Sequence, residues 1–133
     1  MNKDCVSLEI AQKLQKAGWK GITAHVWWKH AGDVEYTLIT NKQAIEYSML
    51  RWVQEFIPAP TATQLAEELP AYIEVKGKDG HLGFWKRSLN SPNMKYGCNY
   101  QNLQERPLCY TNAPTLPDAL GLMMEYLLVD KLI

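Results

Sequence analysis

Near the C-terminal end of the sequence, apolar residues form a wide helical stripe. Between residues 115 and 130 they recur every three or four positions, at Leu116, Ala119, Leu120, Met123, Met124, Leu127 and Leu128. This spacing predicts a helix whose apolar side must be buried against another part of the chain. Thr115 and Asp118 stand in capping-box positions, and Pro117 suits the first turn because amides there have no intrahelical partner.

A second amphipathic segment covers residues 4–17. Val6, Ile10, Ala11, Leu14 and Ala17 recur at helical spacing, and Gly18 follows where a left-handed cap is expected. The opposite side is polar and is predicted to face solvent. The chain therefore has an amphipathic helix near each end, and the apolar sides of both helices are predicted to pack against the same surface.

Between these helices, apolar and polar residues alternate as they do in β-strands. Residues 22–28 and 34–40 predict one hairpin, residues 72–76 and 81–87 predict a second with 77–80 as its turn, and 95–101 and 107–111 predict two more strands. With 133 residues the chain has the size of one domain. We therefore predict an α+β fold over residues 1–133, an antiparallel sheet of about four to six strands packed with the N-terminal and C-terminal helices.

The segment 41–56 is ambiguous from sequence. Its apolar residues fit a helical stripe, and an irregular loop fits as well. After it, Pro58 and Pro60 force an extended backbone. Thr61 and Gln64 then predict a short capped helix, which Pro70 ends.

The pattern as a whole resembles a known group of proteins. The residues that carry the likeness are the first helix ending at Gly18-Trp19 and two junctions, Ala59-Pro60-Thr61 and Ala113-Pro114-Thr115. They resemble small uncharacterised proteins of phages, prophages and related elements of gut bacteria, which are similar in turn to a phage α/β/α-sandwich domain. The resemblance implies helices packed on a sheet and no assigned activity, so it brings no catalytic residues with it.

Charge and cysteine usage narrow the function. Fourteen Lys and Arg balance fourteen Asp and Glu, so the chain lacks the overall positive charge on which binding to nucleic acid or an acidic membrane usually depends. No apolar run approaches the roughly 20 residues of a membrane span, and no signal peptide is recognisable. Three widely spaced cysteines are typical of reduced thiols. We expect a cytoplasmic protein without a membrane partner.

No catalytic or metal-binding pattern stands out. His25 and His30 are separated by five positions, which sends strand side chains to opposite faces, so we expect no metal site and no cofactor. Cys98 and Cys109 lie on strands that a turn can bring together as cross-strand neighbours. A small enzyme using one of these thiols with His81 is one alternative reading of the sequence.

The aromatic residues suggest binding instead. The chain has five Trp and seven Tyr against two Phe, and Trp and Tyr suit surfaces that are partly apolar and partly wet. The candidate contact residues are Trp27, Trp28, Tyr36, Trp85, Lys86 and Arg87. Trp27 and Trp28 are consecutive in a predicted strand, so they should face opposite sides. We expect a non-enzymatic protein that binds another protein, with a homodimer allowed by open sheet edges; the alternative is a binder of single-stranded nucleic acid.

Overall fold

The computed structural model describes residues 4–30, 34–49, 54–86, 95–102 and 107–133. The elements in these ranges are α1 (Leu8–Lys16), β1 (His25–His30), β2 (Thr37–Thr40), α2 (Asn41–Ser48), β3 (Gln54–Pro58), α3 (Ala62–Glu68), β4 (Tyr72–Val75), β5 (Lys78–Lys86), β6 (Tyr96–Gln101), β7 (Pro107–Ala113) and α4 (Leu116–Val129). The predicted α+β class with antiparallel strands is confirmed.

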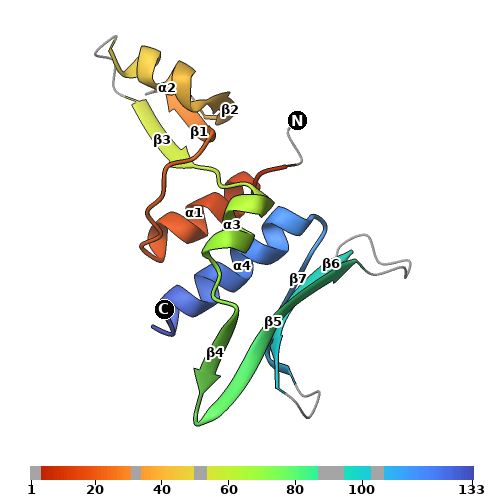
Figure 1. Cartoon of the computed structure of the whole chain (residues 1–133). Coiled ribbons are helices and arrows are strands. Elements are labelled where there is room, and N and C mark those ends of the chain that lie inside the picture. The colour runs from red at the N-terminus through yellow and green to blue at the C-terminus, as the bar shows by residue number, and fades with distance from the viewer. Residues whose placement is uncertain (1–3, 31–33, 50–53, 87–94, 103–106) are drawn as a thin grey trace.

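The strands form two sheets, whereas the sequence predicts one. A three-stranded sheet has the order β2-β1-β3, and a four-stranded sheet has the order β4-β5-β6-β7. The reason lies at the junction between them. Pro58 ends β3, and the chain then leaves the sheet to form α3, so β4 starts a new one. Figure 1 shows α1, α3 and α4 lying between the two sheets.

The two terminal helices make the centre of the main core. Val6, Leu14, Leu120 and Leu127 are all 0% exposed, as their periodicity predicts. The helices approach closely at Gly121, where an added Cβ would lie 2.5 Å from Cγ2 of Ile10. α4 has 14 residues, and no helix in the described ranges is long and apolar enough to cross a membrane.

The N-terminal ends of α1 and α4 are joined by a hydrogen bond. Ser7 is the N-cap of α1, and its backbone N–H donates to Oδ1 of Asp118 in the first turn of α4, at 2.7 Å. The Thr115 hydroxyl accepts from the N–H of Asp118 as predicted. In a capping box the Asp118 side chain would accept a hydrogen bond from the N–H of Thr115. Here the Asp118 carboxylate accepts from the N–H of Ser7 instead.

The three-stranded sheet is covered on both faces. On one face Val26 of β1 joins Ile39 and Ala44 in a small core, against which Trp28, Tyr47 and Phe56 pack. On the other face Trp27, Leu38 and Ile57 belong to the main core, and β3 contacts α1. Because α2 lies on one side and α1 on the other, neither face of this sheet is open.

The four-stranded sheet is covered on one face only. Ile73, Cys98 and Tyr100 are buried on the inner face, where β6 and β7 contact α4. The phenolic O–H of Tyr100 donates to the backbone carbonyl of Pro70 at 2.7 Å, so the buried hydroxyl has a partner. Figure 1 shows the helices on this side of the sheet.

The turn of the second hairpin differs from its prediction. The sequence places the turn at residues 77–80, but β5 begins at Lys78, which pairs with Val75. The turn is the pair Lys76 and Gly77, with φ angles of 52° and 80°. Two left-handed residues between paired strands form the tight turn that matches the twist of a hairpin, which explains the shorter loop.

The ambiguous segment 41–56 contains both a helix and a strand. Residues 41–48 form α2, so the helical reading is correct there, and residues 50–53 lie outside the described ranges. From Gln54 onward the helical reading is wrong, because β3 pairs with β1 and Phe56 lies opposite Trp28. The pairing with a strand far away in sequence overrides the local helical spacing.

The complete capping box lies where the sequence analysis did not place one. The Thr40 hydroxyl accepts from the N–H of Gln43, and the Gln43 side chain accepts from the N–H of Thr40, at 3.1 and 3.0 Å. At the predicted box, the Thr61 hydroxyl caps α3, but Nε2 of Gln64 donates to the carbonyl of Ile22 at 2.9 Å. Gln64 therefore holds the segment before β1 instead of completing the cap.

Candidate functional site

The predicted contact residues Trp27 and Trp28 do face opposite sides of β1. Trp27 packs on the main core, and its Nε1 donates to the carbonyl of Val6 at 3.2 Å. Trp28 packs on the small core with its ring centroid 5.0 Å from that of Tyr47, and its Nε1 is buried without an acceptor among the described residues. Both rings are half-buried in packing contacts, so this pair does not form a joint contact surface.

Tyr36 belongs to a small polar cluster on the three-stranded sheet. Its hydroxyl donates to the Glu55 carboxylate, and that hydrogen bond raises the pKa of the Tyr36 hydroxyl. Nζ of Lys29 lies 3.9 Å from the same carboxylate and 5.2 Å from the centre of the Tyr36 ring. These three side chains satisfy one another, which favours a structural role.

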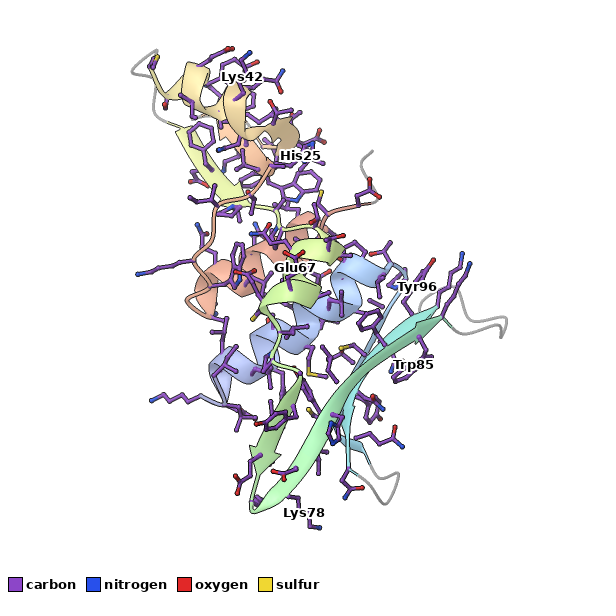
Figure 2. The ribbon with its side chains drawn as sticks, viewed as in Figure 1. His25, Lys42, Glu67, Lys78, Trp85 and Tyr96 are labelled. Carbon is purple, nitrogen blue, oxygen red and sulfur yellow. The ribbon has the colours of Figure 1, made fainter. Side chains whose placement is uncertain are left out.

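Trp85 lies on the four-stranded sheet, on the face turned away from the helices. An added Cβ at Gly97 would lie 2.5 Å from Cε2 and Cζ2 of the indole, so the ring lies directly on the backbone of β6. Only a glycine at this position leaves room for that arrangement. Figure 2 shows Trp85 and Tyr96 on opposite sides of the sheet, as the register of Trp85 with Gly97 requires.

Lys86, one of the two predicted basic residues, does not join Trp85. Lys86 follows it in β5 and pairs with Tyr96, with Nζ 5.9 Å from the Tyr96 ring on the other side of the sheet. Arg87 lies outside the described residues. The five predicted contact residues in the described ranges are thus divided between two sheets and do not form one patch.

Another surface emerges from the strand register. The residues that point away from the helices form rows across the four-stranded sheet, and the row at the hairpin end holds Glu74 and Asp79. We call the other three rows together the open face: Tyr72, His81 and Gln101 in the first row, Gly83, Asn99 and Tyr110 in the second, and Trp85, Gly97 and Asn112 in the third. None of the described helices lies on this side (Figure 1). Within the described part of the chain, the open face is therefore a sheet surface of aromatic, amide and glycine residues that no helix covers.

The two tyrosine side chains of the open face are strongly exposed, whereas Trp85 is half-buried. Tyr72 is 64% and Tyr110 is 63% exposed, on opposite edges of the sheet. The Tyr72 ring is 6.3 Å from the imidazole of His81. Gly83 carries no side chain and leaves a shallow floor between the rings, whereas Gly97 is covered by the Trp85 indole. The surface thus combines two raised tyrosine rings with a flat backbone segment at Gly83.

The centre of the open face is uncharged. Asn99 donates through Nδ2 to Oε1 of Gln101 at 3.3 Å, and none of the nine residues is Lys, Arg, Asp or Glu. Charges begin at the hairpin end, where Glu74 and Asp79 are paired across β4 and β5 with Lys76 and Lys78 beside them. An uncharged aromatic centre with charges at its margin is typical of protein interfaces.

Most of this surface is not predictable from the sequence, for an identifiable reason. The alternation in 72–76 places Ile73 and Val75 inside, and so already places Tyr72 outside. Tyr110 and Asn99 join Tyr72 only through the pairing of β5, β6 and β7. That pairing cannot be deduced from the periodicity of single strands.

Cys98 and Cys109 lie on the inner face of the four-stranded sheet, away from His81. Burial raises the pKa of the Cys98 thiol to about 12, and it also raises the pKa of Cys109. Cys98 pairs with Thr111, and Cys109 with Tyr100, so the two cysteines are diagonal neighbours on adjacent strands, and both are free thiols. Thiols held protonated, with the imidazole on the opposite face, do not form a nucleophile and base pair.

A cleft of about 690 Å³ lies where α3 and α4 begin. It is lined by Asp4, Thr61, Ala62, Thr63, Lys95, Tyr96, Pro114, Thr115, Leu116 and Pro117. Thr61 and Thr115 already serve as N-caps there. Within the described ranges, no three His, Cys, Asp or Glu side chains are placed to hold a metal ion.

Comparison with known proteins adds no relative. No family model, no curated protein and no solved structure matches the chain.

Proposed function

We propose that the protein acts by binding another protein through the open face and catalyses no reaction of its own. The observation that carries this proposal is the uncovered, uncharged and aromatic surface of the four-stranded sheet. Tyr and Trp are enriched at the centres of protein interfaces, whereas charged residues are depleted there. Trp85, which lies flat on Gly97, is the expected anchor of the contact.

The alternatives receive less support. A binder of single-stranded nucleic acid needs cations beside its stacking rings, and the nine residues of the open face carry none. A Cys and His enzyme needs a thiolate near a base, and the inner-face thiols and His81 point away from each other. A role in protein binding accounts for the exposed tyrosine rings and for the lack of charged residues among the nine residues of the open face.

The resemblance noted in the sequence suggests the setting of that role. We propose an accessory protein of a phage or an integrated element, working in the cytoplasm of its bacterial host. Cys5, Cys98 and Cys109 form no disulfide, which suits a reducing compartment.

Site-specific photo-crosslinking tests the binding role. A benzophenone side chain at Tyr72, on the open face, is expected to crosslink one partner protein in the native host. The same side chain at Ile45, 52% exposed on α2, is the control and should not crosslink it. Trp85→Ala should weaken binding of the captured partner by about 30-fold, the effect of an interface anchor.

A matched surface variant makes the test selective. Glu67→Ala changes an exposed residue of α3, away from the open face, and should leave the affinity unchanged. Equal crosslinking from positions 72 and 45, or full affinity in Trp85→Ala, would contradict the proposal.

A further inference from the structure

The two sheets have four edge strands, and these differ in how well they are protected. β2 and β4 have four residues each, too few to offer a long edge. β3 carries Glu55 and ends at Pro58. Short length, charge and proline are the usual means by which a sheet edge avoids pairing with another chain. Three of the four edges are therefore protected.

β7 is the unprotected edge. It spans seven residues, Pro107–Ala113, contains no charged residue and has proline only at its first position. It is the last strand in the order β4-β5-β6-β7. Outside the sheet, none of its backbone groups makes a backbone hydrogen bond to another described residue. An edge of this length and composition is a template for an added strand.

We propose that a second copy of this chain supplies the added strand, with the two β7 strands antiparallel about a two-fold axis at Tyr110. Tyr110 is the middle residue of the seven, so in this register each Tyr110 lies opposite the Tyr110 of the other copy. The seven residues then all find partners. Two four-stranded sheets become one sheet of eight strands, and the two open faces become one continuous surface.

A second feature of the fold lies along the same edge. On α4, Leu122, Tyr126 and Val129 follow one another at helical spacings of four and three residues, on one side of the helix. One turn before Tyr126, Sδ of Met123 lies 3.8 Å from Sγ of Cys109 in β7. Because Met123 and Tyr126 are three residues apart on one side of the helix, this side of α4 lies next to β7. Val129 is 62% exposed in the single chain.

The two-fold pairing gives this apolar stripe a partner. Both copies of α4 lie on the inner side of the joined sheet, next to the axis, so their stripes face each other across it. The dimer buries apolar surface on the helix side while the strands pair along the edge. This inference uses the sheet edge and goes beyond the proposed function, which uses the centre of the open face.

The test compares two tyrosines that have the same exposure and lie on the same face but at opposite edges of the sheet. Tyr110 and Tyr72 lie on the same face and are 63% and 64% exposed, but Tyr110 is on β7 and Tyr72 is on β4 at the opposite edge. Tyr110→Lys places two ammonium groups directly opposite each other at the axis, and like charges in that position oppose pairing. Its dimer dissociation constant should rise at least about tenfold. Tyr72→Lys should leave the constant unchanged.

Sedimentation equilibrium over a concentration series measures both constants, and circular dichroism checks that each variant is folded. Disulfide trapping gives an independent readout. Tyr110→Cys is expected to form a covalent dimer on mild oxidation, since residues directly opposite in a ladder bring their Cβ atoms within about 5.5 Å. Tyr72→Cys should not.

Three results would overturn the inference. They are a wild-type chain that stays monomeric at every concentration, a dimer equally weakened by Tyr72→Lys and Tyr110→Lys, and covalent trapping through position 72 instead of 110. None of these results affects the crosslinking of a different partner protein. The dimer inference and the proposed binding function can therefore be contradicted independently of each other.

Discussion

The two sheets of this protein use tryptophan in different ways. In the three-stranded sheet, α2 and α1 cover opposite faces, and Trp27 and Trp28 are each used in packing. In the four-stranded sheet only the inner face is covered, and Trp85 lies on the bare side over Gly97. Residue type alone therefore does not identify a contact surface. The layer that covers each face of the sheet decides whether an aromatic ring stabilises the fold or is left for a partner.

The sheets also differ in the cores beneath them. The main core joins α1, α3, α4 and the inner face of the four-stranded sheet, whereas the small core has only Val26, Ile39 and Ala44 as fully buried members. Removing the same kind of side chain from each core should therefore have unequal effects on stability.

The largest effect is expected in the main core. Leu127→Ala removes a side chain that is 0% exposed and should lower the free energy of unfolding by about 4–5 kcal/mol, because transfer and cavity costs add. Ile39→Ala in the small core removes a side chain of the same size that is 8% exposed, and it should cost only about 2 kcal/mol because fewer buried residues surround it. Urea denaturation measures both. Val34→Ala, at a site that is 93% exposed, is the control, and equal losses in the two cores would remove the distinction between them.

The inner face should make the protein sensitive to alkali. The pKa of Cys98 is about 12 in the folded chain, above that of an unfolded thiol at about 8.5. Above pH 8.5 the folded state therefore binds more protons than the unfolded state, so stability falls as pH rises. This thiol contributes about 1.4 kcal/mol per pH unit.

Chemical denaturation between pH 8 and 10.5 under reducing conditions measures that slope. Cys98→Ala should be less stable at pH 7 because of its cavity, but its stability should decline less steeply with pH. An unchanged slope in this variant would show that Cys98 does not cause the alkaline loss.

Trp27 and Trp28 should respond differently to loss of the indole N–H. Trp27→Phe loses the hydrogen bond to the Val6 carbonyl, whereas Trp28→Phe removes an N–H that has no acceptor among the described residues. Trp27→Phe should therefore cost about 1 kcal/mol more than Trp28→Phe, as measured by thermal denaturation. The reverse order would mean that Trp28 has the more important polar contact.

The smallest effects are expected at the helix caps. Thr40→Ala breaks the complete capping box of α2 and should cost about 1 kcal/mol, by urea denaturation. Gln43→Ala removes only the returning half and should cost a few tenths of a kcal/mol. Gln64→Ala leaves the cap of α3 intact and should loosen the backbone near Ile22, visible as faster amide exchange there. A loss of α3 helicity in Gln64→Ala would argue for a capping role instead.

Much of the secondary structure was predictable because its signals are local. The apolar periodicity of α1 and α4 and the Thr61 and Thr115 caps lie within a few residues of sequence. The hairpin β4–β5 is local too, although its turn is tighter than predicted. Segment 41–56 shows the limit, since β3 depends on pairing with β1 and not on its own spacing.

The candidate site was less predictable than the fold. Trp85 stands out in the sequence, but its position depends on Gly97 in the neighbouring strand. The chain divides into two sheets because α3 lies between β3 and β4, and this division separates Trp27 from Trp85. Long-range pairing sets both features, and single-segment patterns carry no information about it.

The hydrogen bond between Ser7 and Asp118 joins residues 111 positions apart. During synthesis α1 leaves the ribosome before α4, and both sheets are translated between them. The apolar side of α1 has to wait for α4, so the nascent chain exposes it to chaperones while the residues between the two helices are translated. A pause before residue 116 would leave Val6 and Leu14 without the helix that covers them.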